Sequence, residues 1–162
     1  NAQHIHRLTP EDLEKKLRSF IVARGPMSIP SETFHRLVTL EQPRMKTLND
    51  FFEATDFFFS IENYSASLLI SKNQTKENTL EVLRALKTSL SEVPNTFDRS
   101  IFTLKIEPLV ERWGRGGVLW PLRVAVSGKA ASPDPLDIIE ILGKEETIKR
   151  LETAIVKLNE LA

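Results

Sequence analysis

The stretch Pro121-Leu122-Arg123-Val124-Ala125-Val126-Ser127-Gly128 is the most informative part of the chain. Two short stretches follow it, Ser132-Pro133 and then Leu142-Gly143-Lys144-Glu145, before a final amphipathic run. Together they place one arginine on a short apolar segment, beside a proline-rich turn and two predicted helix starts. An arginine held in this way suits the binding of an RNA loop.

Length and composition limit the class of protein. A chain of 162 residues, 41% of them hydrophobic, can bury a core as one domain or as two small lobes. No apolar run approaches the roughly 18 residues of a membrane span, and the first residues form no leader peptide, so we expect no membrane attachment and a cytoplasmic location. Without cysteine, a disulfide framework and a zinc ribbon are excluded. Because the sequence begins with Asn1, we expect a fragment of a longer protein.

The charges of the chain cancel, with 22 basic and 22 acidic residues. This balance argues against a protein that binds nucleic acid through its net charge, so any RNA contact must be local. Two windows without acidic residues could form such a local basic face, one between Glu111 and Asp134 and one between Glu41 and Asp50. The first contains Arg112, Arg115, Arg123 and Lys129, and the second contains Arg44 and Lys46.

Capping signals predict three helices in the first part of the chain. Pro10 and the acidic pair after it suit the first turn of the first helix. The expected N-caps are Thr9, Ser31 and Thr47, the last with Asp50 as its capping-box partner, and the expected stops are Gly25-Pro26 and Pro43. Residues 60–73 are polar and weakly patterned, so we place a lobe boundary there.

Helical periodicity continues through the second part of the chain. A long helix is predicted from about Thr75 to Pro94, followed by a helical pattern that Pro108 should break or kink near Ile106. Arg115-Gly116-Gly117 is predicted to be a loop. Asp134 with Pro135 should begin another helix that ends at Gly143, and a last helix carries the apolar residues Ile148, Leu151, Ile155 and Leu158.

Three blocks of sequence resemble one family, in the family's order. Pro121–Gly128, together with Ser132-Pro133 and Leu142–Glu145, is similar to the C-terminal end of bacterial-type glutamyl-tRNA synthetases. Asn1–Ile5 with Leu8–Glu11 resembles the family's link out of its catalytic half, and Gln42–Leu48 with Phe57–Phe59 resembles its Arg-Pro-Arg, Thr-Leu and paired-aromatic block. The chain therefore resembles the C-terminal anticodon-binding region of these class I enzymes.

The resemblance implies an all-α fold of two small helical lobes, about residues 1–70 and 71–162. On pattern alone, the alternation of Leu122, Val124 and Val126 predicts a short strand. The family has a helical segment there, and an isolated strand would lack a partner, so we expect a helix.

The resemblance also implies a function for the longer protein, which is ATP-dependent ligation of glutamate to tRNA(Glu). The chain lacks both adenylate-forming signatures of the catalytic half, so we expect it to be inactive alone and to bind no ATP or other cofactor. Its expected partners are the anticodon loop of tRNA(Glu) and the catalytic domain of the parent enzyme, and we expect a monomer.

Arg44 matches the family arginine that recognises the third anticodon base. A guanidinium group only donates hydrogen bonds, which suits the O2 and N3 acceptors of cytosine. Guanine would present two donors to it, so Arg44 should favour glutamate anticodons, which end in C, over the glutamine anticodons UUG and CUG, which end in G. The alternative is a surface arginine that pairs with Glu41 or Asp50.

Arg123 matches a second family arginine that contacts the anticodon. Its alternative is an arginine that binds the C-terminal carbonyl groups of a helix. Nearby, Trp120 could stack on an unpaired base or pack in the core. The turn formed by Ser132, Pro133 and Pro135 should approach a splayed nucleotide, although Asp134 stands where the family usually has glycine. Together Arg44 and Arg123 should line an RNA groove between the lobes.

Weaker candidates for contact with the RNA backbone are Lys46, Arg112, Arg115 and Lys129. His4, His6 and His35 lack the carboxylate or thiol companions of a zinc or iron site, so we expect no metal. Phe57–Phe59 should belong to the core or to a lobe interface. Two other functions stay open on the pattern of amphipathic helices and neutral charge, a helical protein–protein interaction module and a helical carrier of a small ligand.

Overall fold

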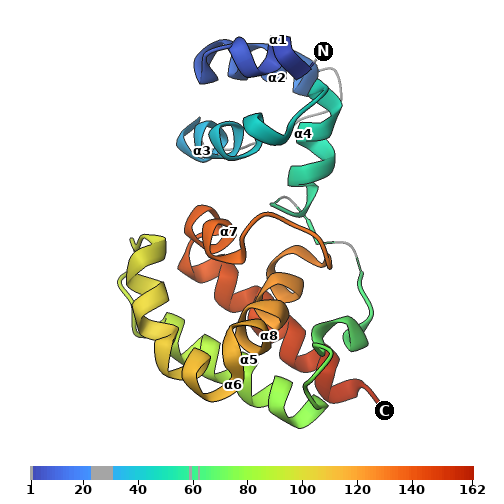
Figure 1. The fold of residues 1–162 in the computed structure, drawn as a ribbon, viewed down its shortest axis with the longest axis vertical. Helices are drawn as coiled ribbons and strands as arrows, with labels where there is room; N and C mark the ends of the chain where they lie inside the picture. The colour runs from blue at the N-terminus through green and yellow to red at the C-terminus, as the bar shows by residue number, and fades with distance from the viewer. Residues whose placement is uncertain (1, 23–30, 59, 62) are drawn as a thin grey trace. The chain divides into compact units, whose positions relative to one another are not determined.

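The structure is a computed structural model that describes residues 2–22, 31–58, 60–61 and 63–162. The chain divides into two compact units, residues 1–59 and 60–162. All regular structure in the described ranges is helical, and these ranges contain no strand. Figure 1 shows both units. The prediction of an all-α fold with two helical lobes is confirmed.

The first unit is built from short helices. Its elements are α1 (Ala2–Arg7), α2 (Pro10–Val22), α3 (Ser31–Glu41), the 3-10 helix η1 (Gln42–Arg44), α4 (Leu48–Thr55) and η2 (Asp56–Phe58). Two of the predicted caps are present as expected. The Asp12 backbone N–H donates to Thr9 Oγ1 at 3.2 Å, and Thr47 with Asp50 forms a complete capping box. The third, Ser31, is itself the first residue of α3, and the predicted stop at Gly25-Pro26 lies outside the described residues.

The core of the first unit lies between α2, α3 and α4. Its buried side chains are Ile5, Leu13, Leu17, Phe34, Leu37, Val38, Met45, Phe51 and Phe57. The Phe34 and Phe51 rings meet edge to face with their centroids 5.5 Å apart. Gln42 Nε2 donates to the carbonyl oxygens of Ile5 and Leu8, at 2.9 and 2.8 Å, and so ties the end of α1 to η1. Phe57 is a core residue, as predicted for that segment.

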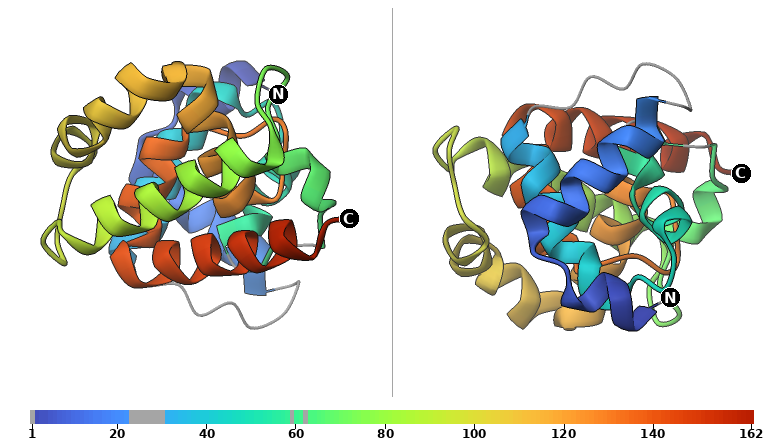
Figure 2. Two further views of the ribbon diagram at one scale, coloured as in Figure 1. Left: turned by 90° about the horizontal axis from the view of Figure 1, so that it is seen from below. Right: turned by 90° about the horizontal axis from the view of Figure 1, so that it is seen from above.

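The second unit contains the longer helices. Its elements are η3 (Ala66–Leu69), α5 (Lys76–Ser91), α6 (Arg99–Ser127), α7 (Pro135–Leu142) and α8 (Lys144–Glu160). Helix α5 packs against both α6 and α8, and α7 covers α6 (Figure 2). The core between them includes Leu83, Leu86, Leu90, Phe102, Leu122, Val126, Ile139, Leu151 and Leu158.

Side-chain caps and glycines set the ends of these helices. Thr75 accepts from the Asn78 N–H at the start of α5, and Asp98 and Asp134 cap α6 and α7 in the same way. Gly143 separates α7 from α8 at φ 83°, a conformation that side chains with a Cβ rarely adopt. The predicted helices around Thr75, Asp134 and Gly143 therefore have the predicted boundaries.

The first unit ends at Phe59 and the second begins at Ser60. The boundary expected from the sequence was at about residue 70. The intervening residues include η3, which packs against α6 and α8. Leu69 of η3 is fully buried there. Because this short apolar turn has no helical periodicity, its membership of the second unit was not visible in the sequence.

Helix α6 corrects two predictions. It continues through Pro108, whose missing N–H would have bonded the Leu104 carbonyl oxygen. Both residues are on the exposed face of the helix. The interruption lies instead at Gly114, with φ 76° and ψ 155°. Arg115, Gly116 and Gly117 are not a loop, since they form the first turn of the helical segment after this break.

Residues 121–127 are helical, as the resemblance implied. Leu122, Val124, Ala125 and Val126 are all fully buried, so this part of α6 is apolar around most of its circumference. A helix buried on several sides has no single apolar stripe. The strand-like alternation is therefore a coincidence of sequence.

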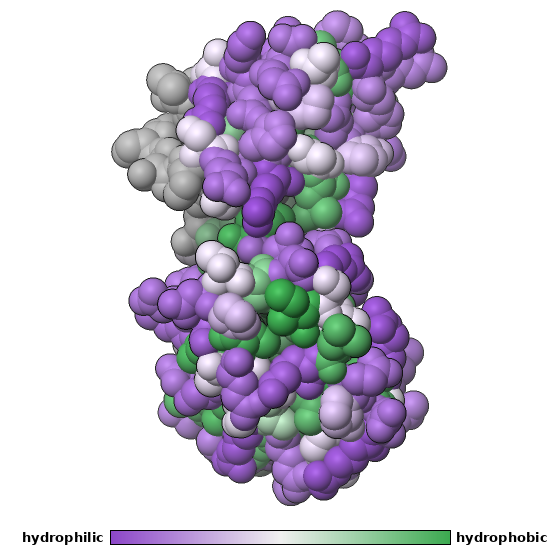
Figure 3. Space-filling model, turned by 90° about the vertical axis from the view of Figure 1, so that its left-hand side faces the viewer, coloured by the Kyte–Doolittle hydropathy of each residue, from purple (hydrophilic) through white to green (hydrophobic). Residues whose placement is uncertain are grey.

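The surface of the described residues is mainly hydrophilic on the face shown in Figure 3, with apolar atoms in separate patches. The large apolar side chains that are exposed include Ile101 and Leu104 on α6 and Val156 on α8. No helix among the described residues has both the length and the hydropathy needed to cross a membrane.

Candidate nucleic-acid interface

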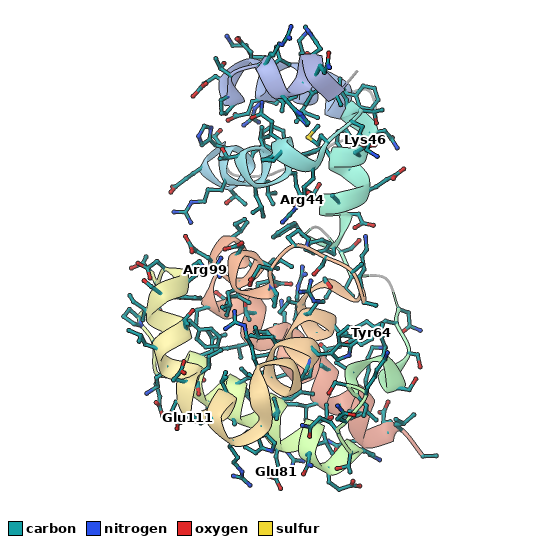
Figure 4. The ribbon with its side chains drawn as sticks, viewed as in Figure 1. Arg44, Lys46, Tyr64, Glu81, Arg99 and Glu111 are labelled. Carbon is teal, nitrogen blue, oxygen red and sulfur yellow. The ribbon has the colours of Figure 1, made fainter. Side chains whose placement is uncertain are left out.

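Arg44 lies at the end of η1, on the connector between α3 and α4, with 55% of its side chain exposed (Figure 4). Its Nη1 donates to Glu41 Oε1 at 3.3 Å. This is the ion pair that was the alternative to an RNA-binding role. The pair uses one nitrogen of a guanidinium group that has five N–H donors, so the other donors remain available to a ligand.

Glu41 itself is buried, with 3% of its side chain exposed. Burial raises the pKa of its carboxyl group above the ordinary 4.5, and the charge and hydrogen bond of Arg44 lower it in part. A buried carboxylate that faces one arginine restricts the positions of that arginine. Glu41 was named only as a surface partner of Arg44, because a helix-terminal glutamate in a sequence gives no sign of burial.

Lys46 is two residues beyond Arg44 and is exposed. Its backbone N–H donates to Asp50 Oδ2 at 2.7 Å, and the Thr47 N–H donates to the same oxygen at 3.1 Å. The hydrogen bonds from the Thr47 side chain and these two amides hold the pKa of Asp50 below its ordinary value. The connector that carries both basic residues is thus fixed at its C-terminal end by a capping box.

Arg123, on α6, is half-buried and holds the predicted turn. Its Nη1 donates to the Ser132 carbonyl oxygen at 2.6 Å, to Ser132 Oγ at 2.8 Å and to the Pro133 carbonyl oxygen at 3.0 Å. The structure therefore brings Arg123, Ser132 and Pro133 together. The alternative role, bonding of a helix C-terminus, belongs to Arg150, whose Nη1 donates to the Val126 carbonyl oxygen at 2.6 Å.

Pro135 begins α7 and is buried. Asp134, the acid that departs from the family pattern, accepts the Leu136 N–H at 2.8 Å and lies 3.5 Å from Arg99 Nη2. Arg99 also pairs with Asp137. The charge of Asp134 is therefore taken up within the protein, by the cap of α7 and by an arginine at the start of α6.

Trp120 is half-buried, and its Nε1 donates to the Leu68 carbonyl oxygen at 2.8 Å. Its polar edge thus binds η3, while its ring lines a surface pocket together with Trp113. Trp113 was not among the predicted site residues, although two of those residues, Arg112 and Arg115, flank it in the sequence.

The weaker candidates lie at different places. Arg112 Nη2 is 3.1 Å from Glu81 Oε2, and its guanidinium carbon lies 4.1 Å from the centroid of the Trp113 ring. Arg115 is exposed at the start of the helical segment after Gly114, and the Lys129 N–H donates to Ser127 Oγ at 3.1 Å beyond the end of α6. Within the described residues, no group of three or more potential ligands could hold a metal ion.

The candidates thus form two groups. Arg44 and Lys46 belong to the first unit, and all the others belong to the second. The structure assembles Arg123 with its turn and fixes the connector of Arg44. The groove expected between the two arginines spans both units and stays a prediction.

The profile of a family described as "Anticodon binding domain" matches residues 9–155. The chain belongs to this family. The chain is 32% identical over 161 residues to a glutamate--tRNA ligase of Flavobacterium johnsoniae, and the match covers 96% of the chain and 30% of the ligase. It is 34% identical over 157 residues to glutamate--tRNA ligase 2 of Halorhodospira halophila, covering 95% of the chain and 33% of that ligase.

Solved structures agree with these relatives. A glutamate tRNA ligase from Elizabethkingia meningosepticum, in complex with its amino acid, superposes with a TM-score of 0.84 and 26% identity, over 98% of this chain and 31% of that one. The resemblance to glutamyl-tRNA synthetases is confirmed, and the chain spans about a third of the length of the ligases it matches.

Proposed function

We propose that the chain is the tRNA-binding region of a glutamyl-tRNA synthetase and binds the anticodon loop of tRNA(Glu). The family match over residues 9–155 is the observation that carries this proposal. In the parent enzyme, a catalytic half would use ATP to ligate glutamate to the tRNA, and this region would supply specificity. This match favours RNA binding over the protein-interaction module and the small-ligand carrier.

Arg44 is the proposed determinant for the third anticodon base. Its ion pair with Glu41 leaves the guanidinium group half-exposed and restricts its direction. A donor group held in this way can bond the O2 and N3 acceptors of cytosine without first losing much conformational freedom. With guanine at this position, N–H donors of the base would face N–H donors of Arg44. The free-energy cost would be comparable to that of burying unpaired polar groups.

Arg123 is proposed to act on the RNA through the turn that it holds. Three oxygen acceptors of Ser132 and Pro133 converge on one of its nitrogens, which fixes the turn in one conformation. A fixed turn of small side chains lets its backbone approach a splayed nucleotide. Trp120 would complete this surface, and Pro135, buried at the start of α7, would support the turn from within the protein. Lys46, Arg112, Arg115 and Lys129 would contact phosphate groups.

Binding of the chain to a 17-nucleotide stem-loop with a glutamate anticodon tests the function. We expect binding that weakens as salt is raised, because each neutralised phosphate releases counterions. The same stem closed by a different loop is the control for contacts with the stem alone. Equal affinity for both hairpins would place the contacts on the stem and contradict recognition of the anticodon loop. Absence of binding, or binding without salt dependence, would favour the protein-interaction module.

A further inference from the structure

A surface pocket of about 460 Å³ lies in the second unit, between the segment 70–74 and helix α6. Trp113 and Trp120 form one wall of the pocket, and Lys72 and Asn73 lie on the opposite wall. All the residues that line it belong to residues 60–162, so the second unit contains the whole site. Its size is within the range of pockets that hold small ligands, about 300 to 1,000 Å³.

The two indole rings present apolar surface to this pocket although both are only half-buried. Trp120 is fixed by its hydrogen bond to Leu68, and Arg112 covers Trp113 at 4.1 Å from the ring centroid. Two immobilised, partly exposed aromatic rings form a surface suited to stacking of a flat heterocycle.

The segment 70–74 is held against α6 by a close contact at Gly117. Gln74 Nε2 donates to the Trp113 carbonyl oxygen at 3.4 Å. A Cβ atom added at Gly117 would come within 2.8 Å of the same nitrogen, so the Gln74 side chain would have to shift from this position. The pocket is therefore built by specific contacts between its two walls.

The charged residues at the pocket are basic. None of the lining residues is acidic. Lys72 on one wall and Arg115, which adjoins the lining residue Gly116, form no ion pair or hydrogen bond with another described residue. The helical segment after Gly114 also begins here, and the first amides of a helix have no acceptor within it. These features favour an anionic group beside the stacked ring.

We propose that this pocket binds one unpaired nucleotide of the bound RNA, with its base against Trp113 and Trp120 and its phosphate near Lys72 and Arg115. A planar heterocycle that carries an anion matches both the tryptophan side chains and the basic residues of the pocket. The inference rests on the proposed function, and it adds Trp113 and Lys72 to the interface.

The chain contains only two tryptophans, and both line the pocket, so intrinsic tryptophan fluorescence reports on this site alone. We expect the anticodon stem-loop to quench this emission on binding, and a fully paired duplex of the same stem not to do so. Trp113→Ala should weaken stem-loop binding roughly 5- to 150-fold, the range for loss of one base–aromatic stack.

Three variants separate stacking from folding and from bulk charge. Trp113→Phe keeps an aromatic face and should retain most of the affinity. Lys72→Ala should weaken binding and reduce the salt dependence, whereas Lys149→Ala, at an exposed position of α8, should change neither. A far-UV spectrum identical to wild type is required of each variant.

The affinity of a labelled stem-loop, measured by anisotropy, distinguishes the outcomes. Binding without quenching, or unchanged affinity in Trp113→Ala, would overturn the pocket assignment and leave the proposed function standing. Absence of any stem-loop binding would overturn both. Adenosine 5′-monophosphate is the second probe. If this nucleotide quenches the tryptophan emission and added stem-loop does not displace it, the pocket does not bind the RNA and the assignment is overturned.

Discussion

At the scale of single residues, the ion pair between Arg44 and Glu41 restricts the guanidinium group that we propose to recognise the third anticodon base. Arg44→Gln replaces a group that only donates by an amide that both donates and accepts, so guanine is no longer excluded. We predict that the preference for C over G at the third anticodon base narrows by about tenfold or more, since roughly 1.4 kcal/mol is lost for one unpaired donor. Affinities for stem-loops that differ at this base measure the change.

The control for this variant is Arg36→Gln on α3. Arg36 is 47% exposed and pairs with Glu32, which resembles the setting of Arg44 except that the acid is exposed. It should leave the C-over-G ratio unchanged. An Arg44→Gln protein that still rejects G as strongly as wild type would remove Arg44 from the interface.

Glu41 makes the stability of the first unit dependent on pH. Its pKa is raised in the folded state, so folding favours the protonated carboxyl group. This stabilising contribution is complete below the ordinary value of 4.5 and is lost as pH rises through the folded pKa. Glu41→Gln mimics the protonated form at every pH.

We therefore predict that the stability of Glu41→Gln rises relative to wild type as the pH is raised from acidic to neutral. The quantity compared is the free energy of unfolding of the two proteins at each pH. Urea denaturation at several pH values, followed by the helical signal, measures this difference. Glu32→Gln, at an exposed position of α3, is the matched control. A difference between Glu41→Gln and wild type that stays constant with pH would contradict the burial of this carboxylate as the cause.

Arg123 tests whether an arginine acts on RNA directly or through a turn. Lysine keeps the charge and three donors, but its ammonium nitrogen is one bond closer to the backbone than Arg123 Nη1, so it should fall short of the three converging acceptors. We predict that Arg123→Lys weakens stem-loop binding nearly as much as Arg123→Ala, and that both lower the free energy of unfolding by about 1–3 kcal/mol as buried acceptors lose their donor. Stem-loop affinity together with denaturant unfolding separates the two effects. Full binding by the lysine variant would indicate a direct phosphate contact.

At the scale of helices, the sequence was informative wherever a local hydrogen bond sets an end. Thr47, Thr75 and Asp134 accept amides two or three residues away, so their caps could be predicted from neighbours in the chain. Whether a helix continues through Pro108 depends on whether the Leu104 carbonyl oxygen can bond to solvent, which is a property of the tertiary structure. The contacts of Arg123 and Trp120 were hidden for the same reason, because their partners lie 9 and 52 residues away.

Gly114 and Gly116 provide a matched pair for the break in α6. Both have open space where a Cβ atom would be, but Gly114 has φ 76° whereas Gly116 is helical. We predict that Gly114→Ala lowers the free energy of unfolding by about 1 kcal/mol or more through backbone strain. Gly116→Ala should raise it by roughly 0.5–1 kcal/mol through helix propensity. Thermal unfolding of the two variants checks the signs, and a stabilising Gly114→Ala would place the break elsewhere.

At the scale of the whole molecule, a neutral chain carries its RNA-binding candidates as local groups on two units. The first unit contains Arg44 and Lys46, and the second contains Arg123, its turn and the tryptophan pocket. Each unit also buries its own set of apolar side chains. A hydrophobic core of its own is what a piece of chain requires to fold independently.

We therefore predict that residues 60–162, produced alone, fold with a cooperative thermal transition and bind the glutamate anticodon stem-loop more weakly than the full chain. Because Arg44 is missing from this piece, it should not distinguish C from G at the third anticodon base. Its tryptophan emission should still be quenched by the stem-loop, since both tryptophans are retained. Leu86→Ala in the same piece, a fully buried position, should lower the free energy of unfolding by about 2–5 kcal/mol and serves as the control for cooperative folding. Discrimination between C and G by residues 60–162 would show that the third base is recognised within the second unit, and the assignment of Arg44 would fall with it.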